Sequence, residues 1–187
     1  MSAPVTIPNA VPENLLRGLE ANWPAESSDV WHRYSGTMGD KLATLHWQCL
    51  PAEAWPVLCE IGSIMECYYK GCVIDWRLHG AGLHQINPGG CLPRHLDGEI
   101  HPRTRLSRWL SAVLFLGTAG DGDGGELVIE GKATIRPQRG LLAIFETPQQ
   151  WHEVRPTNIV RRTVALFGYR PGDGHGRISA LFQGVSQ

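Results

Sequence analysis

The sequence predicts a mainly β domain, a sandwich or barrel of jelly-roll type, with helices at its N-terminal end. After Cys72, short β-rich runs follow one another about every ten residues, with Gly and Pro between them, as in all-β sandwiches and barrels. Before Cys72, apolar residues recur at helical spacing instead. Strands and long helices do not alternate, so a Rossmann fold is not expected.

Two helices are expected in the first third of the chain. Segment 12–23 places its leucines and Trp23 on one helical stripe. Segment 51–69 repeats the pattern with Trp55 and Met65 on its apolar face. An amphipathic helix buries its apolar stripe against another layer. These two helices are therefore expected to cover one sheet of the jelly roll.

Nine strands are expected in the rest of the chain. Each run is rich in β-branched or aromatic residues and ends at a turn signal. The expected strands fall within residues 73–80, 83–90, 91–97, 108–117, 126–131, 132–137, 141–148, 151–156 and 161–169.

Length, charge and cysteine usage narrow the class of protein. The 187 residues suit one domain, and the formal net charge of −1 predicts no affinity for nucleic acid or an anionic membrane. The longest apolar stretch, around 109–117, is too short to span a bilayer, and residues 1–16 do not resemble a signal peptide. Five cysteines without a CxxC motif are typical of reduced thiols. A cytoplasmic protein is expected.

Two segments resemble known functional motifs but lack a feature that each motif requires. Segment 120–125, GDGDGG, matches a dinucleotide-binding pattern, but the hairpin sequence after it cannot open the required helix. A solvated hairpin loop is expected there, with Gly124 and Gly125 allowing a bulge or a close approach of two chains. Segment 151–156 begins like a zinc protease motif but has Pro156 where the second histidine should stand.

His95 and Asp97 are the first candidate metal ligands. About one His-x-Asp/Glu triplet is expected from composition alone, so the pair needs support from elsewhere in the chain. Residues i and i+2 of a strand point to the same face, so one imidazole and one carboxylate can meet a single ion. His152, in another expected strand, would complete two histidines and a carboxylate, which is the facial triad of non-haem Fe(II) oxygenases.

The order of these motifs resembles a known family. The His95-x-Asp97 motif, the runs SAVLFLG, GGEL (124–127) and IRPQRGLLAIF (135–145), and finally WHEVRP and RRTVALFGY together resemble the Fe(II)/2-oxoglutarate-dependent dioxygenases of the prolyl-4-hydroxylase-like branch. The resemblance covers residues about 80–170. It implies a double-stranded β-helix core with His95, Asp97 and His152 as the Fe(II) ligands. It also implies that 2-oxoglutarate and O₂ are the cosubstrates, that succinate and CO₂ are released, and that a C–H bond is hydroxylated.

An arginine is expected to bind 2-oxoglutarate. Arg161 and Arg162 are adjacent and point to opposite faces of their strand. Arg161 lies on the same face as Thr163 and small residues, which suit a ligand pocket. Arg162 lies on the opposite face, whose other residues are apolar and suit packing against the helices. We therefore favour Arg161, assisted by Thr163, and keep Arg162 as the alternative. The family often carries a tyrosine as a second contact where Ile86 stands here; this contact is left among His84, Gln85 and Asn87.

The expected organisation is a single domain over 1–187, with mainly helical support in 1–70, the core in 72–170 and a tail in 171–187. The expected substrate is a prolyl or other amino-acid side chain in a protein or peptide, or a small molecule. The alternative class is a non-catalytic or cupin-like metal-binding jelly-roll module. Trp151 is expected in the core and Glu153 in solvent. Residues 98–108 form a basic loop, either solvated or a substrate lid over the iron.

Overall fold

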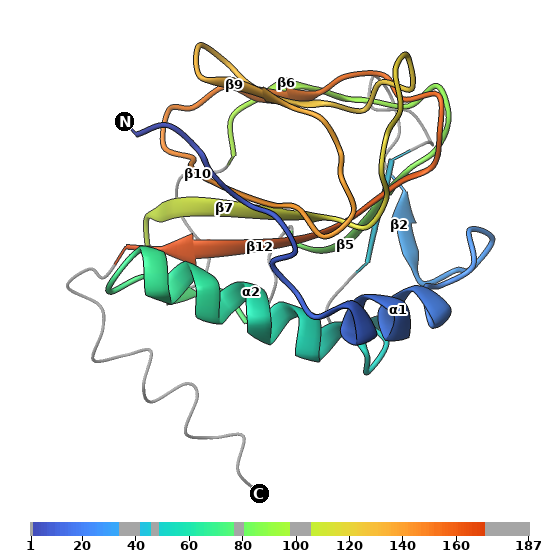
Figure 1. Cartoon of the computed structure of the whole chain (residues 1–187), viewed down its shortest axis with the longest axis horizontal. Coiled ribbons are helices and arrows are strands. Elements are labelled where there is room, and N and C mark those ends of the chain that lie inside the picture. The colour runs from blue at the N-terminus through green and yellow to red at the C-terminus, as the bar shows by residue number, and fades with distance from the viewer. Residues whose placement is uncertain (1, 34–41, 46–48, 77–80, 98–105, 171–187) are drawn as a thin grey trace, which may run out of the picture.

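The computed structural model describes residues 2–33, 42–45, 49–76, 81–97 and 106–170. In this part of the chain, two antiparallel sheets face each other, and two helices lie against the outer side of the larger sheet (Figure 1). In chain order the elements are β1 (Val5–Ile7), α1 (Glu13–Ala21), β2 (Trp31–Arg33), β3 (Leu42–Leu45), α2 (Ala54–Tyr68), β4 (Val73–Ile74), β5 (Gly82–Ile86), β6 (Leu92–His95), β7 (Arg108–Phe115), β8 (Leu127–Ile129), β9 (Ala133–Ile135), β10 (Leu142–Glu146), β11 (His152–Val154) and β12 (Arg161–Tyr169).

The strand order is that of a jelly roll, as the sequence predicts. The larger sheet has the order β1-β10-β7-β12-β5-β3-β2, with β4 paired to β12. The smaller sheet has the order β6-β11-β8-β9. Most neighbouring strands come from distant parts of the chain, because the chain passes repeatedly between the two sheets; β2 with β3 and β8 with β9 are the described neighbours that follow each other directly. The predicted double-stranded β-helix with N-terminal helices is therefore confirmed.

Both predicted helices are present and cover the larger sheet (Figure 1). Helix α1 is amphipathic and buries Leu16 and Leu19. Helix α2 buries Leu58, Ile61 and Met65 on the side that meets strands β7 and β12. The apolar stripes read from the sequence are thus the faces that pack on the sheet.

The first third of the chain also contains strands that the sequence did not predict. Strands β1, β2 and β3 precede the first core strand. Strand β1 pairs with β10 and β3 pairs with β5, so both are held by partners far along the chain. Three- or four-residue strands carry too little periodicity to be recognised alone. Of the strand expected within 73–80, only β4 is observed, and residues 77–80 lie outside the described residues.

Two apolar clusters flank the larger sheet. One lies between this sheet and the helices and includes Val164 and Leu166 of β12. The other lies between the two sheets and includes Phe115 and Phe145. Because side chains alternate along a strand, β12 sends Thr163 and its same-face neighbours into the space between the sheets. This space holds the candidate site.

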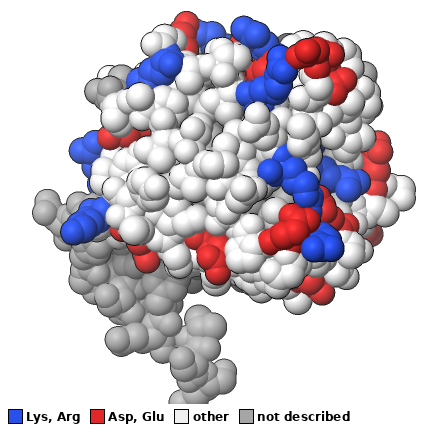
Figure 2. Space-filling view, in the orientation of Figure 1, with Lys and Arg blue, Asp and Glu red and all other residues white. Residues whose placement is uncertain are grey.

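The face shown in Figure 2 carries acidic and basic side chains mixed in its upper and right-hand parts and along its lower edge, and the area around and left of the centre is largely uncharged. No helix in the described ranges is both long and apolar enough to cross a membrane.

Candidate active site

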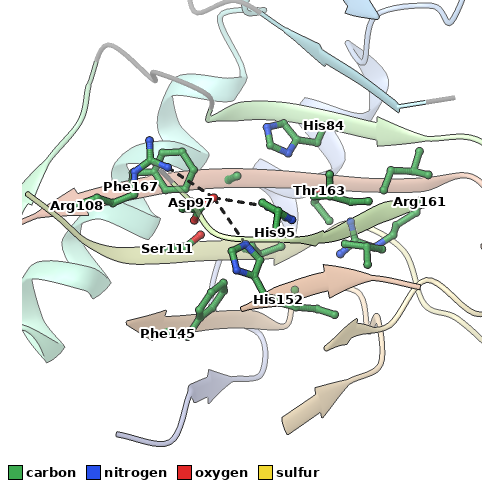
Figure 3. Close-up of a pocket in the computed structure, with 16 residues that line it drawn as sticks. His84, His95, Asp97, Arg108, Ser111, Phe145, His152, Arg161, Thr163 and Phe167 are labelled. Atoms are coloured by element: carbon green, nitrogen blue, oxygen red, sulfur yellow. Dashed lines mark ion pairs between the residues drawn. The ribbon is translucent and has the colours of Figure 1, made fainter. Parts of the chain in front are cut away.

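His95, Asp97 and His152 come together between the two sheets (Figure 3). One ligand atom from each residue lies within 4.8 Å of the others. The Nε2 atoms of His95 and His152 lie 3.8 and 3.7 Å from the same Asp97 oxygen, Oδ1. Two imidazole nitrogens and one carboxylate oxygen brought this close together are the donor set that suits Fe(II) with open positions for other ligands.

Strand pairing explains why residues far apart in sequence meet here. Strands β6 and β11 are antiparallel, and His95 lies directly opposite His152. Their rings have centroids 4.2 Å apart. The register shifts between this pair and the next, Val154 with Leu92, so β6 contains one extra residue, next to Pro93. Asp97 then follows just beyond the end of β6, two residues after His95.

The two histidine rings are oriented by backbone carbonyls. Nδ1 of His95 lies 2.8 Å from the carbonyl oxygen of Pro93, and Nδ1 of His152 lies 3.1 Å from that of Gln150. With the proton on Nδ1, each Nε2 keeps its lone pair for a metal. Burial of His152 lowers its pKa below the usual value, which favours the neutral, metal-binding form.

The donor set fits a divalent metal. The side chain of Asp97 is 11% exposed, and its Oδ2 atom is buried with no hydrogen-bond partner among the described residues. A buried carboxylate oxygen without a partner is costly, and a cation held beside it would remove that cost. The three side chains are therefore arranged to hold an ion rather than to satisfy one another.

Arg161 lies at the other end of the same cavity and is buried (Figure 3). Its Nε donates to the carbonyl oxygen of Gly125 at 2.9 Å, and its guanidinium lies over the ring of Phe115. No carboxylate of the described residues pairs with it. Burial lowers the pKa of Arg161 to about 10, so it stays charged at neutral pH. A buried charge without a protein counter-ion is suited to binding an anion.

Gly124 and Gly125 let the chain pass close to Arg161, as the sequence predicts. Both have positive φ angles, 72° and 76°. A Cβ on Gly124 would lie 2.0 Å from the carbonyl oxygen of Pro156, and one on Gly125 would press on Thr157 and on Arg161 itself. Glycine is therefore favoured at both positions, most strongly at Gly124, and Gly125 brings its carbonyl to the guanidinium.

Arg162 points away from the cavity, to the opposite face of β12. Its Nε donates to Oε1 of Gln85 at 3.1 Å, and its guanidinium lies 5.4 Å from the ring centroid of Trp23. Gln85 also bonds to Asn87, so two of the three candidates for a second 2-oxoglutarate contact belong to this outer network. His84, the third, lines the cavity with Thr163.

Arg108 is the cavity residue that the sequence did not predict. It begins β7, and its Nη1 lies 3.6 Å from Oδ1 of Asp97 while its guanidinium stacks 3.7 Å above the ring of Phe167. In the pairing of β7 with β12, Leu110 lies opposite Gly168 and Arg108 lies opposite the next residue, Tyr169. Trp109 therefore has no partner in β12, which makes a β-bulge. This bulge turns Arg108 toward the cavity, against simple alternation. Arg108 thus begins a strand, as expected for 108–117, and belongs to the cavity wall rather than to the basic loop; residues 98–105 of that loop lie outside the described residues.

Trp151 is not a core residue. It is 36% exposed, and the guanidinium of Arg94 stacks 3.9 Å from its ring centroid. Alternation does point it away from His152, as expected, but that side of the smaller sheet carries no further layer in the described structure. Glu153 is half-buried and is not among the residues that line the cavity.

The cavity that joins these groups has a volume of about 240 Å³. Apart from the ionisable and hydroxyl groups, its walls are apolar. Its lining includes His84, His95, Asp97, Arg108, Ser111, His152, Arg161 and Thr163 together with Ile86, Val113, Phe145, Ala165 and Phe167.

Comparisons with known proteins agree with this site. Residues 81–169 match the family model of the 2OG-Fe(II) oxygenase superfamily. No curated protein sequence matches the chain. Among solved structures, a Pseudomonas putida prolyl-4-hydroxylase is 20% identical with a TM-score of 0.66, covering 90% of this chain and 93% of that one.

Two further structures are similar at low identity. A Trichoplax adhaerens prolyl hydroxylase, in complex with a hypoxia-inducible-factor peptide fragment, is 17% identical with a TM-score of 0.63, covering 89% of this chain and 83% of that one. The non-haem α-ketoglutarate-dependent epimerase SnoN of nogalamycin biosynthesis is 13% identical with a TM-score of 0.67, covering 90% of this chain and 81% of that one.

The fold and the site define a non-haem iron oxygenase. The region that matches the 2OG-Fe(II) oxygenase superfamily, residues 81–169, contains His95, Asp97, His152 and Arg161, and the fold is similar to that of a prolyl-4-hydroxylase. The chain is thus a dioxygenase that uses Fe(II), 2-oxoglutarate and O₂. This result favours the enzyme over the cupin-like or non-catalytic module.

Proposed function

We propose that the protein hydroxylates an amino-acid side chain, most simply that of a prolyl residue, in a peptide or protein. His95, Asp97 and His152 would hold Fe(II) through their two Nε2 atoms and one carboxylate oxygen. Arg161, with Thr163, would bind the distal carboxylate of 2-oxoglutarate. The observation that carries the proposal is the shared cavity, with a His-Asp-His cluster at one end and a buried guanidinium without a protein carboxylate at the other.

The chain's own residues have separable tasks. When bound, the Fe(II) centre supplies the oxidative chemistry that converts 2-oxoglutarate and O₂ to succinate and CO₂ and oxidises the substrate C–H bond. Carbonyl oxygens of Pro93 and Gln150 keep the imidazoles oriented for ligation. Arg161, which lies over the ring of Phe115, would fix the cosubstrate by charge-assisted hydrogen bonds, and Phe145 keeps the cavity wall beside His152 apolar.

The size of the cavity supports a side chain as the reacting group. Sites for drug-sized ligands usually measure about 300–1,000 Å³. The cavity here, about 240 Å³, must hold the cosubstrate as well as the reacting group. A single side chain entering from outside fits this space better than a whole small molecule. The similar structure that was solved with a peptide fragment supports the same choice.

Peptide screening tests this proposal. Wild-type protein with Fe(II), 2-oxoglutarate and O₂ is incubated with a library of proline-containing peptides, and succinate release and peptide mass are measured together. We expect some peptides to gain one oxygen atom in step with succinate, and each Pro→Ala control peptide to gain none. Succinate coupled only to free amino acids or other small molecules would overturn the peptide assignment.

A further inference from the structure

Strand β12 runs along the cavity from one end to the other. Arg161 begins the strand, and Phe167 lies six residues further on. Asp97 lies at the Phe167 end, because Arg108 contacts both the Asp97 carboxylate and the Phe167 ring. A molecule that reaches from Arg161 to the metal ligands must therefore run along β12, past Thr163 (Figure 3).

His84 flanks this path from the neighbouring strand. In the antiparallel pairing of β12 with β5, Arg161 faces Ile86 and Thr163 faces His84. Residues directly opposite each other have Cβ atoms about 4.5–5.5 Å apart, so His84 and Thr163 form a cross-strand pair beside the path. Both side chains line the cavity, and Figure 3 shows the imidazole above Thr163.

The other polar residues of β5 and its end face the opposite way. Gln85 accepts a hydrogen bond from the indole of Trp23 at 2.9 Å, and Asn87 donates to Glu26 at 2.6 Å. Ile86, which does face the cavity, has no polar group. His84 is therefore the residue of β5 that brings a hydrogen-bonding side chain to the cavity.

We propose that His84 binds 2-oxoglutarate, as its second polar contact beside Arg161 and Thr163. The inference rests on the proposed assignment of Arg161 to the distal carboxylate. Both the neutral and the protonated imidazole carry an N–H. His84 can therefore donate a hydrogen bond to a carboxylate oxygen of a cosubstrate that lies beside the His84–Thr163 pair. Together with the Thr163 hydroxyl, it would fix the cosubstrate chain between its two anchored ends.

Binding without turnover tests this contact. Protein loaded with Mn(II) in place of Fe(II) is titrated with 2-oxoglutarate by calorimetry, for wild type, His84→Phe and His84→Gln. We expect His84→Phe to raise the Kd for 2-oxoglutarate by about 10-fold or more, as the loss of one hydrogen bond to a charged group does, and His84→Gln, which keeps a donor, to raise it less. The Kd for Mn(II) should stay at the wild-type value in both variants.

A histidine outside the site supplies the matched control. His32 on β2 is exposed, so His32→Phe should leave both Kd values unchanged. Circular dichroism and melting temperature check folding, and His84→Leu replaces His84→Phe if the larger ring disturbs the fold.

Two results would overturn the assignment of His84. One is a folded His84→Phe protein that binds 2-oxoglutarate as wild type does. The other is a loss of Mn(II) affinity that accounts for the whole effect, which would place His84 with the metal. If the wild-type protein itself failed to bind 2-oxoglutarate, the proposed role of Arg161 would be contradicted too. That result is distinguishable from the two above, which concern His84 alone.

Discussion

Asp97 is the residue on which most of the site's contacts converge. Its Oδ1 atom lies within 4 Å of both imidazoles and of the Arg108 guanidinium, while Oδ2 has no hydrogen-bond partner in the described structure. One carboxylate therefore faces two imidazoles and one guanidinium. This arrangement is suited to an added divalent ion, because Asp97 is the single anionic group among the described residues that line the cavity.

Replacing Asp97 by alanine should abolish turnover and weaken metal binding. The change removes the only carboxylate among the described residues that line the cavity, and with it the anionic ligand. We expect the Kd for Mn(II) to rise by more than the roughly 10- to 100-fold seen when only an outer-shell partner is lost. Asp121→Ala is the control, since that carboxylate lies on the exposed loop and is 94% exposed. Wild-type metal affinity in Asp97→Ala would remove Asp97 from the ligand set.

The adjacent arginines allow a paired comparison on one strand. Arg161→Ala should raise the KM for 2-oxoglutarate about 10- to 100-fold, because it removes charge-assisted hydrogen bonds in a buried site. Arg162→Ala should leave this KM near the wild-type value, since Arg162 bonds to Gln85 on the other face of β12. Steady-state kinetics with varied 2-oxoglutarate measures both. The opposite pattern would exchange the roles of the two arginines.

Some individual residues were predictable from the sequence and others were not. Alternation along a strand separated Arg161 from Arg162 correctly, because β12 is regular between these residues and Phe167. The same rule fails for Arg108, since a bulge at Trp109 changes which face its side chain occupies. Bulges depend on the partner strand, so a single segment of sequence does not reveal them.

Among the elements, the connection at Gly124 and Gly125 links a loop to the Arg161 end of the cavity. Gly124 forms an isolated β-bridge with Thr157, and Gly125 accepts the Arg161 hydrogen bond. The two glycines thus join the loop before β8 to the segment that leads into β12. Their positive φ angles place the backbone where a side chain would not fit.

Two glycine variants separate backbone strain from steric contact. Gly122 and Gly124 both have positive φ angles, but only a Cβ on Gly124 meets another atom within 4 Å, the Pro156 carbonyl oxygen. Gly122→Ala should lower the free energy of unfolding by about 1–2 kcal/mol, the cost of the left-handed conformation. Gly124→Ala should lower it at least about twice as much and also raise the Kd for 2-oxoglutarate. Equal effects in denaturant titrations would contradict the close approach.

The longer elements were easier to predict than the short ones. Helix α2 and strand β12 carry enough periodic apolar residues to be recognised from the chain alone. Strands β1 and β3 are three or four residues long and exist because β10 and β5 offer them a free edge. Such pairings are tertiary contacts, and local sequence carries little sign of them.

At the scale of the whole molecule, Arg139 joins the helical layer to the jelly roll. It lies in the turn between β9 and β10 and bonds to Glu20 of α1, to Glu13 at 3.0 Å and to the carbonyl oxygen of Leu116 at 3.1 Å. The helices also share one apolar cluster with β7 and β12. We therefore propose that helices and sheets form one cooperative unit, consistent with a single domain.

Removing this link should lower stability without dividing the unfolding transition. Arg139→Met should reduce the free energy of unfolding by about 1 kcal/mol and the melting temperature by roughly 2–4 °C. Arg17→Met is the control: it removes an exposed i,i+4 pair to the same Glu13, which is worth about 0.3–0.5 kcal/mol. Calorimetry measures both. Two separate transitions in the wild-type protein would contradict a single cooperative unit.

The central claim is that one cavity holds Fe(II) on His95, Asp97 and His152 and 2-oxoglutarate on Arg161. Anaerobic titration of the protein with Fe(II) and then 2-oxoglutarate tests it most directly, because a bidentate oxoacid on Fe(II) gives a weak visible charge-transfer band. We predict that the band forms in wild type, needs a higher 2-oxoglutarate concentration in Arg161→Ala and is lost in Asp97→Ala. Tight Fe(II) binding with no band at saturating 2-oxoglutarate would contradict the claim.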